Sequence, residues 1–141
     1  MTVSFKSMAS WAILVLILMQ FVPLRRINPP ADSEIQLPES IKHSLKKACY
    51  DCHSYETRWR GISYIAPASW LASSTVSSGR AALNFSTWND CNWREKKMKT
   101  TKLGDVVSAG AAHQPPYYLW QPEAQLTASE TRALLKWLTD F

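Results

Sequence analysis

Five consecutive residues, Cys49-Tyr50-Asp51-Cys52-His53, carry the side chains of this chain that are best suited to holding a cofactor. Two thiols separated by two residues and followed at once by an imidazole fit three kinds of site. They can form two thioether bonds to a porphyrin, act as a redox-active dithiol, or supply half of a zinc site. These five residues alone do not separate the three sites, so the rest of the chain must decide.

The surroundings of the motif disfavour the dithiol and the zinc site. A thioredoxin-like dithiol lies at a strand-to-helix turn, whereas residues 39–48, directly before Cys49, have a helical pattern. A structural zinc site needs four ligands, usually with a second Cys or His pair at similar spacing. Only His43, Cys91 and His113 remain, and none of them forms such a pair.

Covalent haem attachment fits the motif better. Each thiol, of Cys49 and of Cys52, adds to one vinyl group of the porphyrin, and the two residues between them give the reach for vinyl groups on adjacent pyrroles. The imidazole of His53 follows at once and is placed to bind the iron. Cys-x-x-Cys-His is the recognised signature of this attachment, so we expect one haem c, with its iron, per chain.

An uncharged apolar run precedes the motif, from Met8 to Leu24. At about 1.5 Å per residue this run reaches roughly 25 Å, slightly short of a hydrocarbon layer of about 30 Å, and Val3 and Phe5 can extend it. No small-x-small cleavage site follows the apolar run, so a signal peptide is disfavoured. We therefore expect an uncleaved N-terminal transmembrane helix, with the anchor covering residues 1–26.

The charge distribution argues against nucleic acid as a partner. The chain has 16 Lys and Arg against 11 Asp and Glu, a net charge of +5, but Lys6, Arg25 and Arg26 lie in the anchor region. The remainder carries 13 − 11 = +2, which is far from the strongly basic face that binds nucleic acid. These basic residues flank the apolar run on both sides and leave its orientation open. Because bacteria attach haem c outside the cytoplasm, we expect an inner-membrane anchor with the haem domain in the periplasm.

The rest of the chain has the pattern of a small all-α domain. Residues 27–38 contain three prolines and read as a linker, and the haem-binding domain is expected over residues 39–141. Helices are predicted over residues 39–48, from 68 to 79, within 90–109, and after the capping box formed by Thr127 and Glu130. No alternating strand pattern is present.

The segments around the motif resemble a known family. The stretches ACYDCHSYETRW, SYIAPASWL, LNFSTW and PPYYLWQPEAQLTASE, together with QFVPLRRINPP upstream, are similar to small membrane-anchored bacterial haem-binding domains. The resemblance covers about residues 20–140. It implies a cytochrome-c-like helical domain around one covalent haem, and it implies little about a substrate.

One departure from the family pattern concerns the sixth iron ligand. The family commonly has Met-Pro-Pro-x-Tyr-Tyr, and that methionine is its natural sixth ligand, but this sequence has His113 at the methionine position. We expect His53 and His113 to ligate the iron together, which favours the ferric state relative to His/Met ligation. Met98 is the rival ligand, and an open sixth site is the other alternative. His43 should lie on the surface.

Several other residues allow two interpretations. Arg58 or Arg60 would either pair with a haem propionate or be solvated. The basic run 94–102 would either dock an acidic redox partner or form a solvated helix face. Cys91 is buried and inert or forms an intermolecular link. Five residues line the haem or fill an ordinary core: Trp59, Tyr64, Ile65, Trp70 and Tyr117.

The expected function is one-electron transfer by a membrane-anchored monohaem c-type cytochrome in the periplasm, with a redox protein or respiratory complex as partner. The alternatives are a haem-based sensor or gas-binding module with an open sixth site, and a structural haem subunit of a membrane complex. No separate acid–base or nucleophile constellation is present, so an independent enzyme is not expected.

Overall fold

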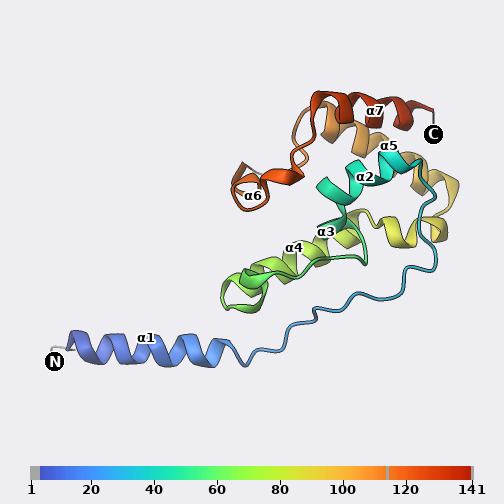
Figure 1. The fold of residues 1–141 in the computed structure, drawn as a ribbon. Helices are drawn as coiled ribbons and strands as arrows, with labels where there is room; N and C mark the ends of the chain where they lie inside the picture. Colours follow the sequence, from blue (N-terminus) through green and yellow to red (C-terminus); the bar gives the residue numbers. More distant parts are fainter. Residues whose placement is uncertain (1–3, 114, 141) are drawn as a thin grey trace.

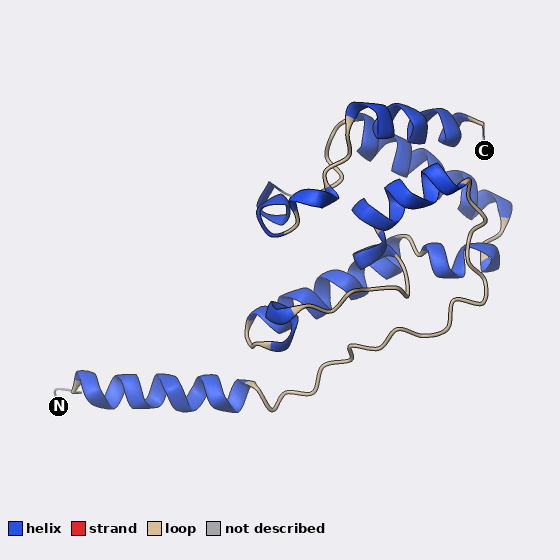
Figure 2. Cartoon of the chain, in the orientation of Figure 1, coloured by secondary structure: helices blue, strands red, loops and turns tan. Residues whose placement is uncertain are grey.

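The computed structural model describes residues 4–113 and 115–140 and contains only helices within them (Figure 2). The all-α prediction is therefore confirmed. The α-helices are α1 (Phe5–Met19), α2 (Glu39–Ala48), α3 (Tyr50–His53), α4 (Ala68–Ala82), α5 (Trp93–Ser108), α6 (Pro115–Trp120) and α7 (Ala128–Thr139). Short 3-10 helices lie between them: η1 (Gly61–Tyr64), η2 (Phe85–Asp90) and η3 (Pro122–Ala124).

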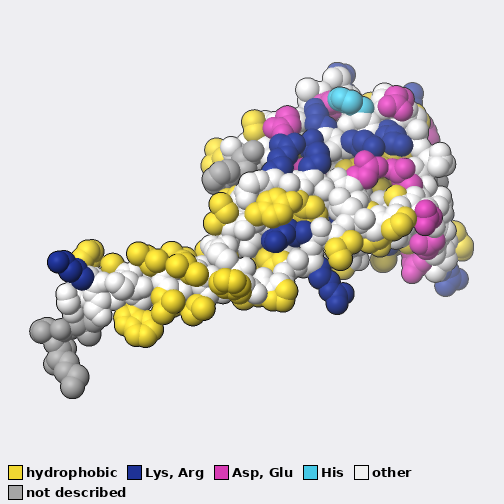
Figure 3. Space-filling view, turned by 60° about the horizontal axis from the view of Figure 1, so that its bottom comes forward, with side chains coloured by type: hydrophobic (Ala, Val, Ile, Leu, Met, Phe, Trp, Pro, Cys, Tyr) yellow, Lys and Arg dark blue, Asp and Glu magenta, His cyan; other side chains and the backbone are white. Residues whose placement is uncertain are grey.

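Helix α1 projects away from the other helices (Figure 1), and apolar side chains cover it along its length (Figure 3). The helix has 15 residues and none of them is buried. At 1.5 Å per residue the helix is about 22 Å long. It is shorter than the predicted apolar run because it ends at Met19, before Pro23 and Leu24. Within the described residues no helix is both long and apolar enough to cross a membrane. The predicted transmembrane helix is thus not supported.

The extended segment after α1 contributes to the folded domain. Ile35 is 3% exposed and belongs to the hydrophobic core, and its backbone N–H donates to the carbonyl of Phe85 at 3.0 Å. The Asn28 side chain donates to the carbonyl of Thr57 at 2.9 Å, and Arg26 donates to that of Ser63 at 2.9 Å. The sequence predicts residues 27–38 to be a linker with few core residues. In the structure, part of this segment packs against the domain and forms hydrogen bonds with it.

The core lies where α2, α5 and α7 pack together (Figure 1). Helix α2 has the bounds predicted from the sequence, and its apolar face, including the fully buried Leu45, contacts this core. Helix α7 contributes Leu134, which is also fully buried. Burying one such side chain stabilises the fold by roughly 1.5–3 kcal/mol.

Two capping boxes fix the starts of α5 and α7. The predicted box at Thr127 and Glu130 is present, with the side chain of each residue bonded to the backbone N–H of the other. A second box, at Asn92 and Glu95, starts α5 in the same way. The carboxylate of Glu130 also pairs with Lys47 of α2 at 2.6 Å, so this cap ties α7 to the helix that leads into the cysteine motif.

Candidate functional site

The cysteine motif lies directly after α2, at a bend in the chain. Cys49 has φ −124° and ψ −31°, which interrupts the α2 helix and separates it from the short helix α3. Cys49 is 7% exposed and belongs to the hydrophobic core. Tyr50 is 2% exposed, and its ring stacks on Phe85 with 5.2 Å between centroids. The motif therefore starts from the packed core rather than from a surface loop.

Helix α4 packs closely against α3 at Gly79. A Cβ atom added to Gly79 would lie 2.5 Å from the carbonyl oxygen of Cys52 and 3.0 Å from its Cβ. No side chain fits in that space, because real Cβ atoms do not approach other atoms so closely. Gly79 therefore lets α4 pack directly on the backbone of Cys52, which fixes the second thiol of the motif.

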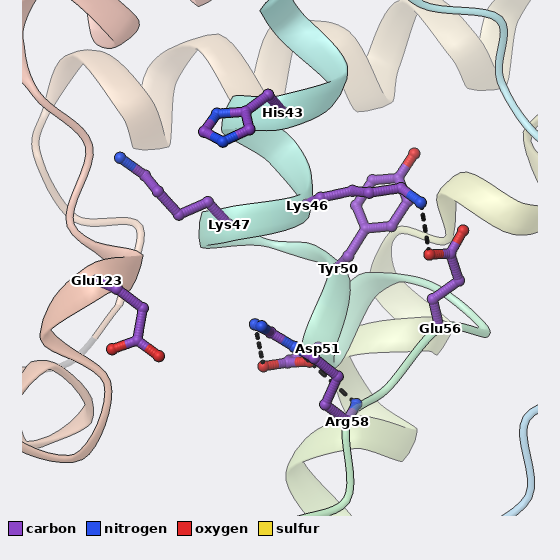
Figure 4. Close-up of a pocket in the computed structure, with 8 residues that line it drawn as sticks. All are labelled: His43, Lys46, Lys47, Tyr50, Asp51, Glu56, Arg58 and Glu123. Atoms are coloured by element: carbon purple, nitrogen blue, oxygen red, sulfur yellow. Dashed lines mark hydrogen bonds and ion pairs between the residues drawn. The ribbon is translucent and has the colours of Figure 1, made fainter. Parts of the chain in front are cut away.

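An ion pair folds the chain after the motif back onto α3 (Figure 4). The guanidinium of Arg58 donates to both carboxylate oxygens of Asp51, at 3.1 and 3.0 Å, and its backbone N–H donates at 3.0 Å. The hydroxyl of Thr57 donates to the Asp51 carbonyl at 2.8 Å. Arg60, the other arginine predicted for a propionate, pairs with Glu123 at 3.3 Å. Both arginines thus have protein carboxylates as partners.

Arg80 of α4 supports the same loop from the other side. Its Nε donates to the carbonyl of Ser54 at 2.8 Å, and its Nη2 donates to the hydroxyl of Thr57 at 2.9 Å. The guanidinium also lies over the ring of Tyr55, 5.1 Å from the centroid. These contacts hold the backbone that immediately follows His53.

A hydrogen bond to a backbone carbonyl orients the imidazole ring of His53. Its Nδ1 lies 3.0 Å from the carbonyl oxygen of Leu83, at the end of α4. A carbonyl can only accept, so Nδ1 donates in this contact, and in the neutral ring Nε2 then has the free lone pair. A metal-binding histidine usually has this arrangement, because the backbone carbonyl fixes both the tautomer and the orientation of the ring.

A cavity of about 370 Å³ brings together the predicted ligands of one iron atom. Cys49, His53 and His113 all line it, and so does the predicted rival ligand Met98. Much of the remaining wall is apolar. Its side chains come from α5, from the residues that follow α5 and from the segment just before α7: Leu103, Val106, Val107, Ala111, Ala112 and Leu126.

Cys52 lines a second cavity of about 270 Å³, together with Trp59 and Tyr117. Tyr117 stacks on His113, with 4.4 Å between ring centroids and 16° between planes. Since His113 lines the first cavity and Tyr117 the second, this stacked pair lies at the boundary between them. Cys49 thus lines the first cavity and Cys52 the second.

The electrostatics of the two thiols disfavour a redox-active dithiol. Burial, followed by the neighbouring Cys52, raises the pKa of Cys49 to about 12. The pKa of Cys52 is also raised, mainly by burial and then by the charge of Asp51, and Arg80 opposes this only in part. A dithiol catalyst needs a thiolate at neutral pH, whereas these groups are thiols.

A structural zinc site also lacks support. Among the described residues, no group of three or more His, Cys, Asp or Glu side chains is placed to hold a metal ion. The third cysteine, Cys91, is half-buried, and Lys99 donates to its sulfur at 3.1 Å. Cys91 lines neither of the two cavities beside the motif.

His113 lines the same cavity as His53. Burial lowers the pKa of His113, and the charge of His53 lowers it further. The hydroxyl of Tyr118 is 3.4 Å from Nδ1 of His113, which leaves the ring only weakly held through that atom. Gln114, the next residue of the expected ligand loop, lies outside the described residues. His43 is exposed, as predicted.

The donor set fits a covalently bound haem. Two neutral thiols are the reactants that add to vinyl groups, and His53 offers Nε2 after its Nδ1 has been used by Leu83. The mostly apolar walls of both cavities suit a porphyrin face. Of the other predicted wall residues, Trp59 and Tyr117 line the second cavity, whereas Tyr64 and Ile65 are exposed.

Several residues that build the site were not predicted from the sequence. Gly79 lies inside a helical pattern, and an isolated glycine there signals close packing that we did not use. The Leu83 carbonyl is a backbone atom and has no sequence signal. Lys99 and Lys102, which line the cavity with the two histidines, were read only as part of a basic run.

A family model described as a haem-binding domain matches residues 14–140, which is nearly the whole chain. The comparisons with curated proteins and with solved structures gave no match.

Proposed function

The chain belongs to the haem-binding domain family, and we propose that it is a monohaem c-type cytochrome that carries single electrons. The observation that carries this proposal is the bond from Nδ1 of His53 to the Leu83 carbonyl, beside a cavity that His113 also lines. The bond orients the His53 imidazole as in a metal-binding histidine, and the shared cavity supports His113 as a second ligand.

Each residue of the motif has a separate role in holding the cofactor. Cys49 and Cys52 would each add their S–H bond across one vinyl double bond, so that sulfur and hydrogen would end on neighbouring carbons with no net oxidation or reduction. His53 would supply a nitrogen to the iron. The Asp51–Arg58 pair and the close packing of Gly79 on Cys52 hold α3 in position for both additions.

When bound, the haem iron supplies a one-electron couple between its ferric and ferrous forms. The chain's own residues then set the potential and limit access to the iron. Apolar side chains of α5 would limit the access of water to the haem face, and the Leu83 carbonyl would make the His53 imidazole a stronger donor. A stronger nitrogen donor stabilises the ferric form and lowers the potential.

We assign His113 as the sixth ligand. A redox titration of the His113→Met variant tests this, because a thioether in place of an imidazole should raise the midpoint potential. The exposed histidine of α2 gives the matched control, since His43→Met removes the same type of side chain away from the cavity and should leave the potential unchanged. An unchanged or lower potential for His113→Met contradicts the assignment.

Carbon monoxide binding separates an electron carrier from a gas-binding module. With His53 and His113 both on the iron, the ferrous protein should bind carbon monoxide slowly or not at all, whereas His113→Ala should bind it rapidly. Rapid binding by the unmodified protein would favour a sensor with an open sixth site and would contradict the carrier function.

We also propose that α1 attaches the protein to the bacterial inner membrane, with the haem domain in the periplasm. The support is the mostly apolar and exposed surface of α1 (Figure 3), followed by Arg25 and Arg26 at its C-terminal side. An apolar helix of this kind is stabilised by lipid, while the arginines remain at the polar surface. In this arrangement a membrane redox complex is the natural electron partner.

Cell fractionation tests the membrane attachment. A double variant, Leu14→Arg with Ile17→Arg, places two charges in α1, and each charge costs about 2.5–3.5 kcal/mol in a lipid interior. We expect it to move to the soluble fraction, while Ile27→Arg, an exposed residue beyond the helix, stays in the membrane fraction. Recovery of the unmodified protein in the soluble periplasmic fraction contradicts the attachment.

A further inference from the structure

Helix α5 directs two lysines to the cavity that contains the histidines. Lys99 and Lys102 line this cavity together with Met98, Leu103 and Val106. Positions 98, 102 and 106 are four residues apart, as are positions 99 and 103, so these side chains form two neighbouring rows on one face of α5. The basic run of the sequence is therefore not only a solvated surface, because two of its members belong to the wall of the site.

No carboxylate opposes these lysines in the cavity. None of the described residues that line it is Asp or Glu. By contrast, other cations near the motif have carboxylate partners: Lys46 pairs with Glu56 and Arg58 with Asp51 (Figure 4). Among the described residues, the acceptor of Lys99 is a weak one, the sulfur of Cys91 at 3.1 Å. The cavity thus has a local positive charge that selects an anionic ligand group.

The lysines and Cys49 lie in parts of the cavity wall that differ in burial. Cys49 is 7% exposed and Val107, in the last turns of α5, is 5% exposed, and both line the cavity. Lys99 and Lys102 lie eight and five residues before Val107, about 12 Å and about 8 Å along the helix at 1.5 Å per residue, and Lys102 is exposed. The cavity therefore has a buried wall with the Cys49 thiol and a more exposed wall with the lysines.

Haem has the same polarity, with two vinyl groups at one edge and two propionates at the opposite edge. We propose that Lys99 and Lys102 bind the two propionate carboxylates. The proposal rests on the proposed covalent attachment, because a haem bound through Cys49 has its vinyl edge at the buried wall of this cavity. Arg58 and Arg60, the partners expected from the sequence, are already paired with Asp51 and Glu123.

Zero-length cross-linking tests the assignment directly. A water-soluble carbodiimide activates a propionate, the lysine amine attacks it, and an amide forms as the urea by-product leaves. After trypsin digestion, mass spectrometry should find the haem-bearing peptide of residues 48–58 joined to a peptide that contains Lys99 or Lys102. Each lysine's own conjugate should disappear in Lys99→Met or Lys102→Met. Conjugates only with other lysines, such as Lys46 or Lys47, would overturn the proposal.

The midpoint potential provides an independent readout. A cation beside the haem destabilises the ferric form, so Lys99→Met and Lys102→Met should each lower the potential. Lys97→Met is the matched control, because it removes the same charge from α5 at a position that does not line the cavity. Equal shifts for all three variants would contradict a specific role for the lysine pair.

The two proposals fail in different ways. If the haem remains on peptide 48–58 but is not joined to Lys99 or Lys102, the covalent attachment stands and the propionate assignment is wrong. If the peptide carries no haem, the covalent attachment fails and the propionate assignment fails with it.

Discussion

Replacing Gly79 with alanine tests how tightly the cysteine motif is held. The added methyl group would lie 2.5 Å from the carbonyl oxygen of Cys52, and its partner is backbone, which cannot turn aside as a flexible side chain can. Either α4 or α3 must move. Because α3 carries both thiols and His53, such a movement disturbs the site as well as the fold.

The size of the effect follows from two opposing contributions. Overpacking costs about 1–3 kcal/mol, and a rigid backbone contact puts Gly79→Ala near the upper end. Alanine in a helix interior is favoured over glycine by about 1 kcal/mol. We therefore expect a net loss of about 2 kcal/mol in the free energy of unfolding, or roughly 10 °C in Tm.

Gly104 gives a matched control within α5. A Cβ added there meets only a methyl group of Leu138, at 3.9 Å, which is an ordinary contact. Gly104→Ala should therefore be stabilising by up to about 1 kcal/mol. Urea unfolding of the three proteins, followed by far-ultraviolet circular dichroism, measures the difference. If Gly79→Ala is as stable as Gly104→Ala, the close packing of α4 on Cys52 is wrong.

Three further predictions concern residues around the site. Hydrogen bonds from Lys47 and Thr127 lower the pKa of Glu130 to about 2. The charged carboxylate therefore stabilises the fold fully at pH values above the unfolded-state pKa of about 4.3, and this stabilisation is lost as the pH falls toward 2. Glu130→Gln keeps a capping side chain, so unfolding should show a deficit of about 1 kcal/mol at pH 7 that shrinks between about pH 5 and pH 2; a constant deficit would count against the ion pair. Asp51→Asn leaves Arg58 without its carboxylate and should cost about 1–3 kcal/mol in thermal unfolding, and an unchanged Tm would show that the pair does not hold the loop. Cys91→Ser should leave the content of covalent haem unchanged, since Cys91 lines neither cavity beside the motif, and a loss of haem in a pyridine haemochrome assay would contradict that.

The sequence predicts best those elements whose signals are local. The periodicity of Ile41, Leu45 and Ala48 predicts α2 with its observed bounds, and the Thr127–Glu130 box predicts the start of α7. The apolar run at the N-terminus was predicted to be longer than the helix that forms. A hydropathy pattern does not show where a helix ends, and here the helix ends at Met19, before Pro23, although the apolar run continues to Leu24.

The candidate site depends on contacts between segments far apart in the sequence, which periodicity cannot show. The motif itself is visible, and so is His113 once the family pattern is considered. The Leu83 carbonyl, the space at Gly79 and the position of Lys99 in the cavity wall are consequences of how α4 and α5 pack. Arg58 illustrates the same limit, because the sequence could not show that Asp51 is its partner.

The pyridine haemochrome spectrum of the denatured, reduced protein tests the central claim most directly. The protein would be expressed with a haem-maturation system and extracted with acid acetone before the measurement. We predict a c-type α band, with the haem remaining on the polypeptide, and its loss in the double variant Cys49→Ser with Cys52→Ser. Haem that is extracted into the solvent, or a b-type spectrum, would contradict the covalent attachment on which the account depends.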